Sequence, residues 1–290
     1  MLDPKVILLA ALTLESGGFA AWWLGRLRAS RSGVVWPTAA SVVVGALTNF
    51  FDTLGVGSFA PTTWLFRTFA LVPDRLVPGT LNVGHALPSV VQALVFIAIV
   101  EVDTWTLWLM IGASMVGAWI GAGVVAGWGR RRVQTGMGLA LLLACGLLVR
   151  QFVAGAPAGA EAIGLGGVWL ALGVAGNFVL GATMMIGVGL YAPCMILVSL
   201  LGLNAKAAFP IMMGSCAFLM PVAAVRFVDR EAYAPRVAVG IALGGVPAVL
   251  VAAFVVRALP LDAVRVLVLA VALYTSLSML AASRAANGDS

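Results

Sequence analysis

Charged side chains are too scarce in this chain to cover the surface of a soluble protein. The sequence carries 17 basic and 11 acidic residues among 290, so 10% of its residues are charged and 62% are hydrophobic. An average soluble chain carries about 25% charged residues. This composition excludes a soluble enzyme, a disordered protein and a secreted disulfide scaffold, and the continuous apolar runs disfavour a membrane β-barrel. We therefore predict an all-α polytopic membrane protein.

Nine apolar runs are long enough to cross a bilayer, because a spanning helix needs about 20 mostly apolar residues. Two further apolar pieces, 61–72 and 193–203, are too short to span alone, and each follows a Gly/Pro interruption. Glu15 and the Trp22-Trp23 pair indicate that the first run is a retained helix rather than a cleaved signal peptide. The nine predicted runs are 5–25, 34–54, 78–100, 105–128, 133–153, 163–186, 207–228, 236–256 and 261–282.

The basic residues predict the orientation of the chain rather than a nucleic-acid partner. They form two clusters, residues 26–31 and 130–132, which we expect in the cytoplasm. Two predicted spans separate residue 77 from the second cluster, so segment 34–77 must start and end on the cytoplasmic side. We expect a helix, a break and a shorter helix folded back as a hairpin. Its first arm could reach about 30 Å, enough to cross the bilayer. The expected location is a bacterial cytoplasmic membrane.

Two Gly-rich segments match without a gap at an offset of 132 residues. Gly55-Val56-Gly57-Ser58-Phe59-Ala60-Pro61 aligns with Gly187-Val188-Gly189-Leu190-Tyr191-Ala192-Pro193, and Pro78 meets Pro210. We predict one transmembrane domain made of an additional N-terminal helix (1–31), a first repeat (32–155) and a second repeat (156–290). Each repeat holds a hairpin and three crossings, so the two are inverted, a plan that recurs in secondary transporters.

The two breaks are the expected binding site. A broken helix exposes backbone N–H and C=O groups, which must be buried in protein or line a wet cavity. The short helices are expected to start at Pro61 and Pro193, with their N-termini attracting anions. Glycines in each break permit positive φ and close approach. The alternative is a Gly-rich motif that only packs helices together.

At these residues the sequence resembles the TauE/SafE sulfite exporter family. The resemblance rests on the two Gly-rich breaks with their prolines and on Pro78-Gly79-Thr80-Leu81-Asn82 and Ala208-Phe209-Pro210, and it covers about residues 34–283. Ser58 and Leu190 stand where the family often has a third glycine. The resemblance implies export of a small sulfur-containing anion, such as sulfite or an organosulfonate, driven by the proton gradient.

Ionisable residues inside spans are functional candidates by default. Asp52, three residues before the first break, is interpreted as a proton-coupling carboxylate or as an interfacial helix end. The single His, His85, shares a helix face with Asn82 and would carry the proton, pair with an anion or form a structural hydrogen bond. Arg67 would balance an anion or extend to the interface.

The candidate residues follow from this hypothesis. Backbone N–H groups and neutral side chains would hold the anion, protons would be the coupling ion, and no metal or cofactor is expected. Proton-coupling candidates are Asp52 and His85. Substrate-binding candidates are Gly55, Gly57, Ser58, Pro61, Thr80, Asn82, His85, Gly187, Gly189, Tyr191, Pro193, Cys194, Ser215 and Cys216.

Two other hypotheses use different residues. A soft-metal permease would use Cys194, Cys216 and nearby Met residues, since thiolate and thioether ligands suit Cu(I). Apolar packing is the favoured interpretation of the same residues. A membrane-embedded enzyme is disfavoured because the sequence has one His, no HExxH, no GxSxG and no clustered carboxylates. We therefore predict no enzymatic activity.

Overall fold

The fold is all-helical in the part of the chain that the structure describes. The structure is a computed structural model that describes residues 4–29, 36–124, 162–184 and 190–285, with scattered positions from 135 to 149. Within these ranges the one isolated β-bridge joins Ala162 and Leu203. The helices are α1 (Pro4–Ala29), α2 (Ala39–Thr53), α3 (Phe59–Thr68), η1 (Asp74–Leu76), α4 (Val77–Ile99), α5 (Thr104–Val124), α7 (Gly167–Met184), α8 (Tyr191–Leu200), η3 (Ala205–Ala207), α9 (Ala208–Asp229), α10 (Pro235–Ala258) and α11 (Leu261–Ala285).

Five helices among the described residues are long and apolar enough to cross a membrane, as in an integral membrane protein. The expected count of nine spans is not confirmed, and most of the predicted run 133–153 lies outside the described residues. The five are Pro4–Ala29, Asp74–Ile99, Gly167–Met184, Ala205–Asp229 and Pro235–Ala258.

One sequence-based expectation about length is wrong. The predicted run 34–54 yields α2, which has only 15 residues and begins where Thr38 accepts a hydrogen bond from the Ser41 N–H. A helix of that length spans about 22 Å, less than the hydrocarbon core of about 30 Å. The first arm therefore does not cross the whole bilayer as a helix.

The chain divides into two compact units. Unit 1 contains residues 1–99 and 216–258, and unit 2 contains residues 100–215 and 259–290. Both units are discontinuous in sequence. Unit 1 therefore combines α1 to α4 with α10, and unit 2 combines α5, α7 and α8 with α11.

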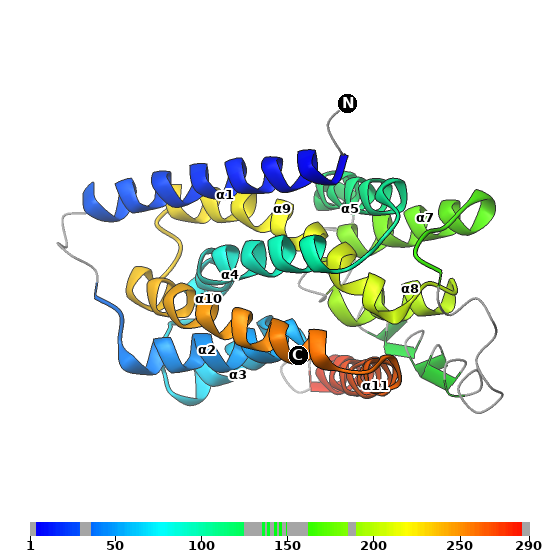
Figure 1. Ribbon diagram of the computed structural model, residues 1–290. Helices are drawn as coiled ribbons and strands as arrows, with labels where there is room; N and C mark the ends of the chain where they lie inside the picture. The colour runs from blue at the N-terminus through cyan, green and yellow to red at the C-terminus, as the bar shows by residue number, and fades with distance from the viewer. Residues whose placement is uncertain are drawn as a thin grey trace. The chain divides into compact units, whose positions relative to one another are not determined.

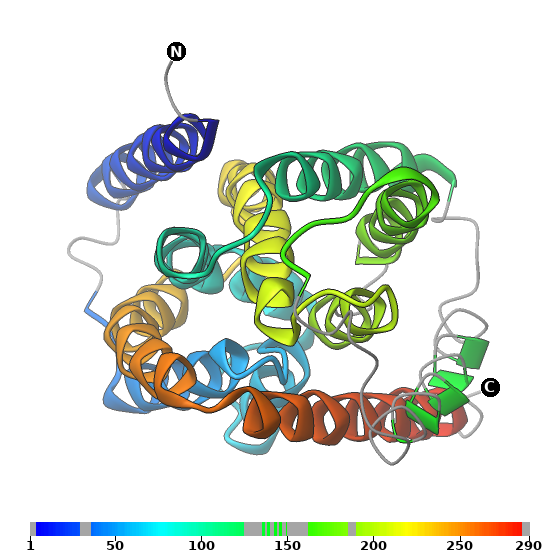
Figure 2. The ribbon, with the colours of Figure 1, turned by 45° about the vertical axis from the view of Figure 1, so that its right-hand side comes forward.

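In unit 1, α2 and α10 lie side by side in both ribbon views (Figures 1 and 2). Glycines allow the backbones of these two helices to approach closely. A Cβ added to Gly45 would lie 2.5 Å from the Cα of Ile241, and one added to Gly244 would overlap the Val42 carbonyl oxygen. Small residues let the backbones of two membrane helices approach this closely.

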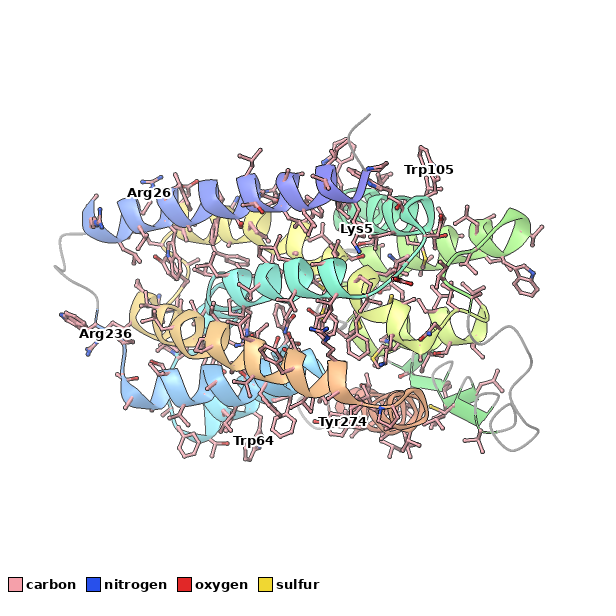
Figure 3. The ribbon with its side chains drawn as sticks, in the orientation of Figure 1. Lys5, Arg26, Trp64, Trp105, Arg236 and Tyr274 are labelled. Carbon is pink, nitrogen blue, oxygen red and sulfur yellow. The ribbon has the colours of Figure 1, made fainter. Side chains whose placement is uncertain are left out.

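Several contacts gather helix ends at one end of unit 1. Arg26, near the end of α1, forms an ion pair with Asp229, and the Arg236 Nε donates to the Trp36 carbonyl at 3.1 Å. The Ala234 N–H donates to the Thr80 hydroxyl at 2.9 Å. Figure 3 shows Arg26 and Arg236 at this end and Lys5 at the far end of α1.

Segment 36–80 consequently begins and ends at the same end of unit 1, as the charge distribution predicts for a hairpin. Both of its ends contact residues 234–236. An apolar cluster in which Val44 and Phe66 pack with Leu81 and Ile241 joins α2, α3, α4 and α10.

In unit 2, α5 packs on α7, again through glycines. A Cβ on Gly117 would overlap the Phe178 carbonyl oxygen, and one on Gly181 would overlap the carbonyl oxygen of Ser114. Asp103 precedes α5 and accepts hydrogen bonds from the Thr106 N–H at 2.8 Å and the Thr106 hydroxyl at 2.9 Å, which fixes the start of that helix.

Candidate functional site

The first predicted break is present between α2 and α3. Gly55 has φ 97° and Gly57 has φ 86°, a backbone region that L side chains rarely adopt. The Gly55 N–H donates to the Asp52 carbonyl at 2.8 Å, so the last turn of α2 closes just before the chain reverses. The short helix begins at Phe59, two residues earlier than predicted, and Pro61 lies in its first turn.

Asp52 lies at the centre of this break. It is 3% exposed, and its Oδ2 accepts a hydrogen bond from Gln92 Nε2 at 2.9 Å. Ser58, on the other side of the glycines, lies close to this carboxyl. Ser58 occupies the N-cap position of α3 but does not cap that helix with its side chain. An Asp–Ser contact therefore spans the break.

Gln92 links α4 to the end of α2. Its Nε2 also donates to the Thr53 hydroxyl at 3.0 Å, and that hydroxyl donates to the Asn49 carbonyl at 2.7 Å. Since a side-chain amide nitrogen has two hydrogens, one Gln92 nitrogen serves both Asp52 and Thr53.

His85 joins the two arms of the hairpin. Its Nδ1 is 2.9 Å from Asn49 Oδ1 on α2, and its Nε2 is 3.1 Å from the Thr62 hydroxyl on α3. Asn49 Nδ2 donates to the Gly45 carbonyl at 2.8 Å, which leaves Oδ1 as the atom facing His85. With this assignment Nδ1 carries the proton and Thr62 donates to Nε2, so the neutral imidazole is fully satisfied.

Together these side chains form what we call the buried polar network. All its members are buried, and they come from α2, the break, α3 and α4 of unit 1. The partners of the Asp52 carboxyl are all neutral. Such an arrangement can bind or release a proton and can offer hydrogen-bond donors to a polar ligand. The network consists of Asn49, Asp52, Thr53, Ser58, Thr62, His85 and Gln92.

Three other polar residues of unit 1 lie apart from this network. The Thr80 hydroxyl donates to the Leu76 carbonyl at 2.8 Å and accepts from Ala234, and Asn82 donates to the Pro78 carbonyl at 2.9 Å. Arg67 is exposed and pairs with the exposed Asp74 at 3.0 Å. The structure therefore gives Thr80 a role in joining α4 to the 230–234 loop and places Arg67 at the surface.

The second break is described only in part. Gly187 and Gly189 lie outside the described residues. The helix that follows begins at Tyr191, two residues before the expected Pro193, and Tyr191, Pro193 and Cys194 are all buried within it.

Unit 2 contains a polar contact of its own, which involves Ser215. The Ser215 hydroxyl donates to the Ile211 carbonyl at 2.8 Å and lies 3.2 Å from Asn177 Nδ2, which also donates to the Met110 carbonyl. Asn177 Oδ1 and the Ser114 hydroxyl are buried without a hydrogen-bond partner. The neighbouring Cys216 is a buried cysteine that belongs to unit 1. Across the described ranges, no three His, Cys, Asp or Glu side chains group closely enough to hold a metal ion.

Several network residues were not among the candidates that the sequence suggested. A usable signal was present: polar residues repeat at helical spacing on one face of each apolar helix, as Asn49, Asp52 and Thr53 do on α2 and His85 and Gln92 do on α4. The network residues missed are Asn49, Thr53, Thr62 and Gln92, and Asn177 of unit 2 was missed as well.

Comparisons of this chain with protein-family models, with curated proteins and with solved structures find no match. The resemblance to the TauE/SafE family therefore stays a prediction from the motifs quoted above.

Proposed function

We propose that this protein is a secondary transporter that exports a small anion, a sulfur oxyanion or sulfonate, across a bacterial cytoplasmic membrane and is coupled to protons. The observation that carries the proposal is the buried polar network at the break between α2 and α3. A broken helix with a buried carboxylate inside an apolar hairpin costs stability, and a protein retains such a group where it serves transport.

Backbone similarities between the two hairpins support an inverted-repeat transporter. Ser58 and Leu190 precede α3 and α8 with nearly the same dihedral angles, φ −84° and ψ −31° against φ −82° and ψ −28°. Both helices have ten residues and start 132 positions apart. Both end with a residue at positive φ, Ala70 at 48° and Gly202 at 82°.

The hydrogen bonds at the C-terminal ends of the two short helices also repeat at the offset of 132 residues. The Leu71 N–H donates to the Phe66 carbonyl at 2.9 Å, and the Leu203 N–H donates to the Val198 carbonyl at 3.2 Å. The proposal takes the two hairpins as equivalent parts whose movement alternates access to the two sides of the membrane.

The chemistry of the network fits a small anion better than a cation. Its hydrogen-bonding groups are neutral apart from the Asp52 carboxyl, namely the hydroxyls of Thr53 and Thr62, the amides of Asn49 and Gln92 and the imidazole of His85. Backbone N–H groups at a helix start favour an anion. Asp52 and His85 provide the titratable groups that coupling to protons requires.

Reconstituted protein tests this proposal directly. Flux of radiolabelled sulfite and of a sulfonate across the membrane of proteoliposomes should depend on the protein and change with an imposed proton gradient. Gly57→Leu should abolish flux while the protein stays inserted and monodisperse, and Gly112→Leu, at a position with open space around it, should not. No flux of either anion, with or without a gradient, would refute transport of this class.

A further inference from the structure

Two polar atoms at the contact between α5 and α7 are buried without a partner. These two helices pack side by side in unit 2 (Figures 1 and 2). Asn177 Oδ1 and the Ser114 hydroxyl have no hydrogen-bond partner among the described residues, and both residues are 0% exposed. Because an unpaired buried polar group costs stability, nearly all such groups in folded proteins have a partner in the chain or in a bound molecule.

The neighbours of Asn177 determine which way its amide points. Nδ2 lies 2.7 Å from the Met110 carbonyl oxygen and 3.2 Å from the Ser215 hydroxyl oxygen. Both oxygens act as acceptors, because the Ser215 hydroxyl donates its hydrogen to the Ile211 carbonyl. Turning the amide over would bring Oδ1 against these two acceptors. Oδ1 therefore keeps its position, and a molecule that binds it must donate a hydrogen bond or be a cation.

The Ser114 hydroxyl is unpaired because its usual acceptor is occupied. A serine hydroxyl in a helix ordinarily donates to the carbonyl four residues earlier, as those of Ser199 and Ser215 do. For Ser114 that carbonyl belongs to Met110, which accepts the helical N–H of Ser114 and the side chain of Asn177. A carbonyl oxygen has two lone pairs, so none is left for the hydroxyl.

The two unpartnered atoms lie within one turn of the same helix contact. Met110, which Asn177 binds, is one turn before Ser114 on α5. Gly181 is one turn after Asn177 on α7, and a Cβ added to it would lie 2.0 Å from the Ser114 carbonyl oxygen. One helical turn rises about 5.4 Å. A water molecule with hydrogen bonds of about 2.8 Å bridges two oxygens up to about 5.6 Å apart, so a single water reaches both atoms.

The surroundings favour water over an ion or a larger ligand. Neither α5 nor α7 carries a charged residue, so a cation between them would be buried without a counter-charge. An unprotonated anion has no hydrogen to donate to Asn177 Oδ1. Close backbone contacts at Gly117 and Gly181 limit the size of a molecule that fits between the helices. Water is small and neutral, and it both donates and accepts.

We propose that one water molecule is bound between α5 and α7, donating a hydrogen bond to Asn177 Oδ1 and accepting one from the Ser114 hydroxyl. Both unpartnered atoms are then satisfied, and the water joins the two helices. Ser215, a substrate-binding candidate from the sequence, is a positioning residue of this water site, because it holds the Asn177 amide in place. The inference goes beyond the proposed transport function and does not depend on it.

The sign of one stability change tests the proposal. Ser114→Ala removes only a hydroxyl oxygen. If that hydroxyl binds the water, its loss should lower the unfolding midpoint of the full-length protein in detergent by about 2–4 °C. If the hydroxyl has no partner, its removal should raise the midpoint or leave it unchanged, and that result would overturn the proposal. Ser199→Ala removes a hydroxyl with a known acceptor in the same unit and is the matched control, with an expected decrease of similar size.

Two further measurements identify the bound molecule. X-ray pulses convert bound water into hydroxyl radicals, and mass spectrometry locates the neighbouring side chains that they oxidise. The buried Met110 should be oxidised in the wild type and at least about threefold less in Ser114→Ala, since a water with one remaining partner is weakly held. Equal oxidation in the two proteins would contradict a water at this site. The unfolding midpoint should be the same in sodium chloride and in choline chloride at equal ionic strength, and an increase in sodium chloride alone would assign the site to a cation instead.

Discussion

The short helix α3 of unit 1 and the helix α8, which starts 132 residues later in unit 2, have the same length, but the residues around them differ in polarity. Both short helices have ten residues and matching N-cap angles. Every member of the buried polar network, however, has an apolar or glycine counterpart at that offset. The pairs are Asn49 and Gly181, Asp52 and Met184, Thr53 and Met185, Ser58 and Leu190, Thr62 and Cys194, His85 and Ala217, and Gln92 and Ala224.

Unit 2 has its own polar contact, but at other positions. Asn177 and Ser215 correspond at the same offset to Gly45 on α2 and Val83 on α4. Close helix packing through glycines and a ten-residue helix that starts near a proline are thus common to both units, while their polar side chains lie at different positions. We expect backbone substitutions to act alike in both units and side-chain substitutions to act differently.

The largest effect should come from glycines at the helix contacts. Gly45→Ala would bring its Cβ to 2.5 Å from the Ile241 backbone, and Gly181→Ala would overlap the Ser114 backbone, so each should destabilise the protein by about 3 kcal/mol. Thermal unfolding in detergent measures this. Gly112→Ala, which meets nothing within 4 Å, is the control. A large difference between Gly45→Ala and Gly181→Ala would break the similarity of the two backbones.

Loss of His85 should have the next largest effect. His85→Ala removes an imidazole that satisfies the buried Asn49 and Thr62, and leaving these polar groups unpaired should cost about 2 kcal/mol and abolish flux. Ala217→Gly, at the corresponding buried position, loses only a methyl group and should cost about 1 kcal/mol. Unfolding midpoints and flux are measured in parallel. An equal loss of unfolding free energy in the two variants would contradict a stabilising role of the buried polar network.

A smaller effect is expected where the helices α3 and α8 end. Ala70 has φ 48° and Gly202 has φ 82°, a region that favours glycine. Ala70→Gly should therefore stabilise the protein by up to about 1 kcal/mol, and Gly202→Ala should destabilise it by about the same amount. Opposite shifts in the unfolding midpoint would support the same ending for the two helices. Shifts of the same sign would contradict the shared helix ending.

The smallest effect should come from Arg67. Its ion pair with Asp74 is exposed on both sides, so Arg67→Gln should change stability by less than about 0.5 kcal/mol. Flux should stay within twofold of the wild type if the anion is held by neutral donors, as about 0.4 kcal/mol would correspond to that factor. A tenfold loss would bring Arg67 back as a substrate-binding residue and would move the site away from Ser58.

The fold class and the position of the first break could be predicted from the sequence. Continuous apolar runs with few charges allow only membrane helices, and Gly55 and Gly57 before Pro61 allow a helix to stop and restart. The length of α2 could not be predicted, because the apolar residues from 34 onward give a high mean hydropathy whether or not they are helical. The structure starts that helix at Ala39, after the Thr38 cap.

The chemistry of the site could be predicted only in part. Asp52, Ser58 and His85 were identified because ionisable or polar residues near a break stand out. Gln92 was not identified, because it lies 40 residues from Asp52 in the sequence and only the packing of α4 on α2 brings the two side chains together. Thr80 was chosen for its place in a motif, and its contact with Ala234 depends on a loop 154 residues away.

The contact between α2 and α10 bears on the order in which the molecule assembles. Residues 39–53 leave the ribosome long before residues 235–258, yet Gly45 packs directly on Ile241. Until α10 has been made, the broken hairpin has no partner for the α2 face that packs on α10, and its turn carries polar backbone groups. The last step in the assembly of unit 1 therefore follows the synthesis of α10, and nascent chains truncated before residue 235 should be held by the insertion machinery or degraded.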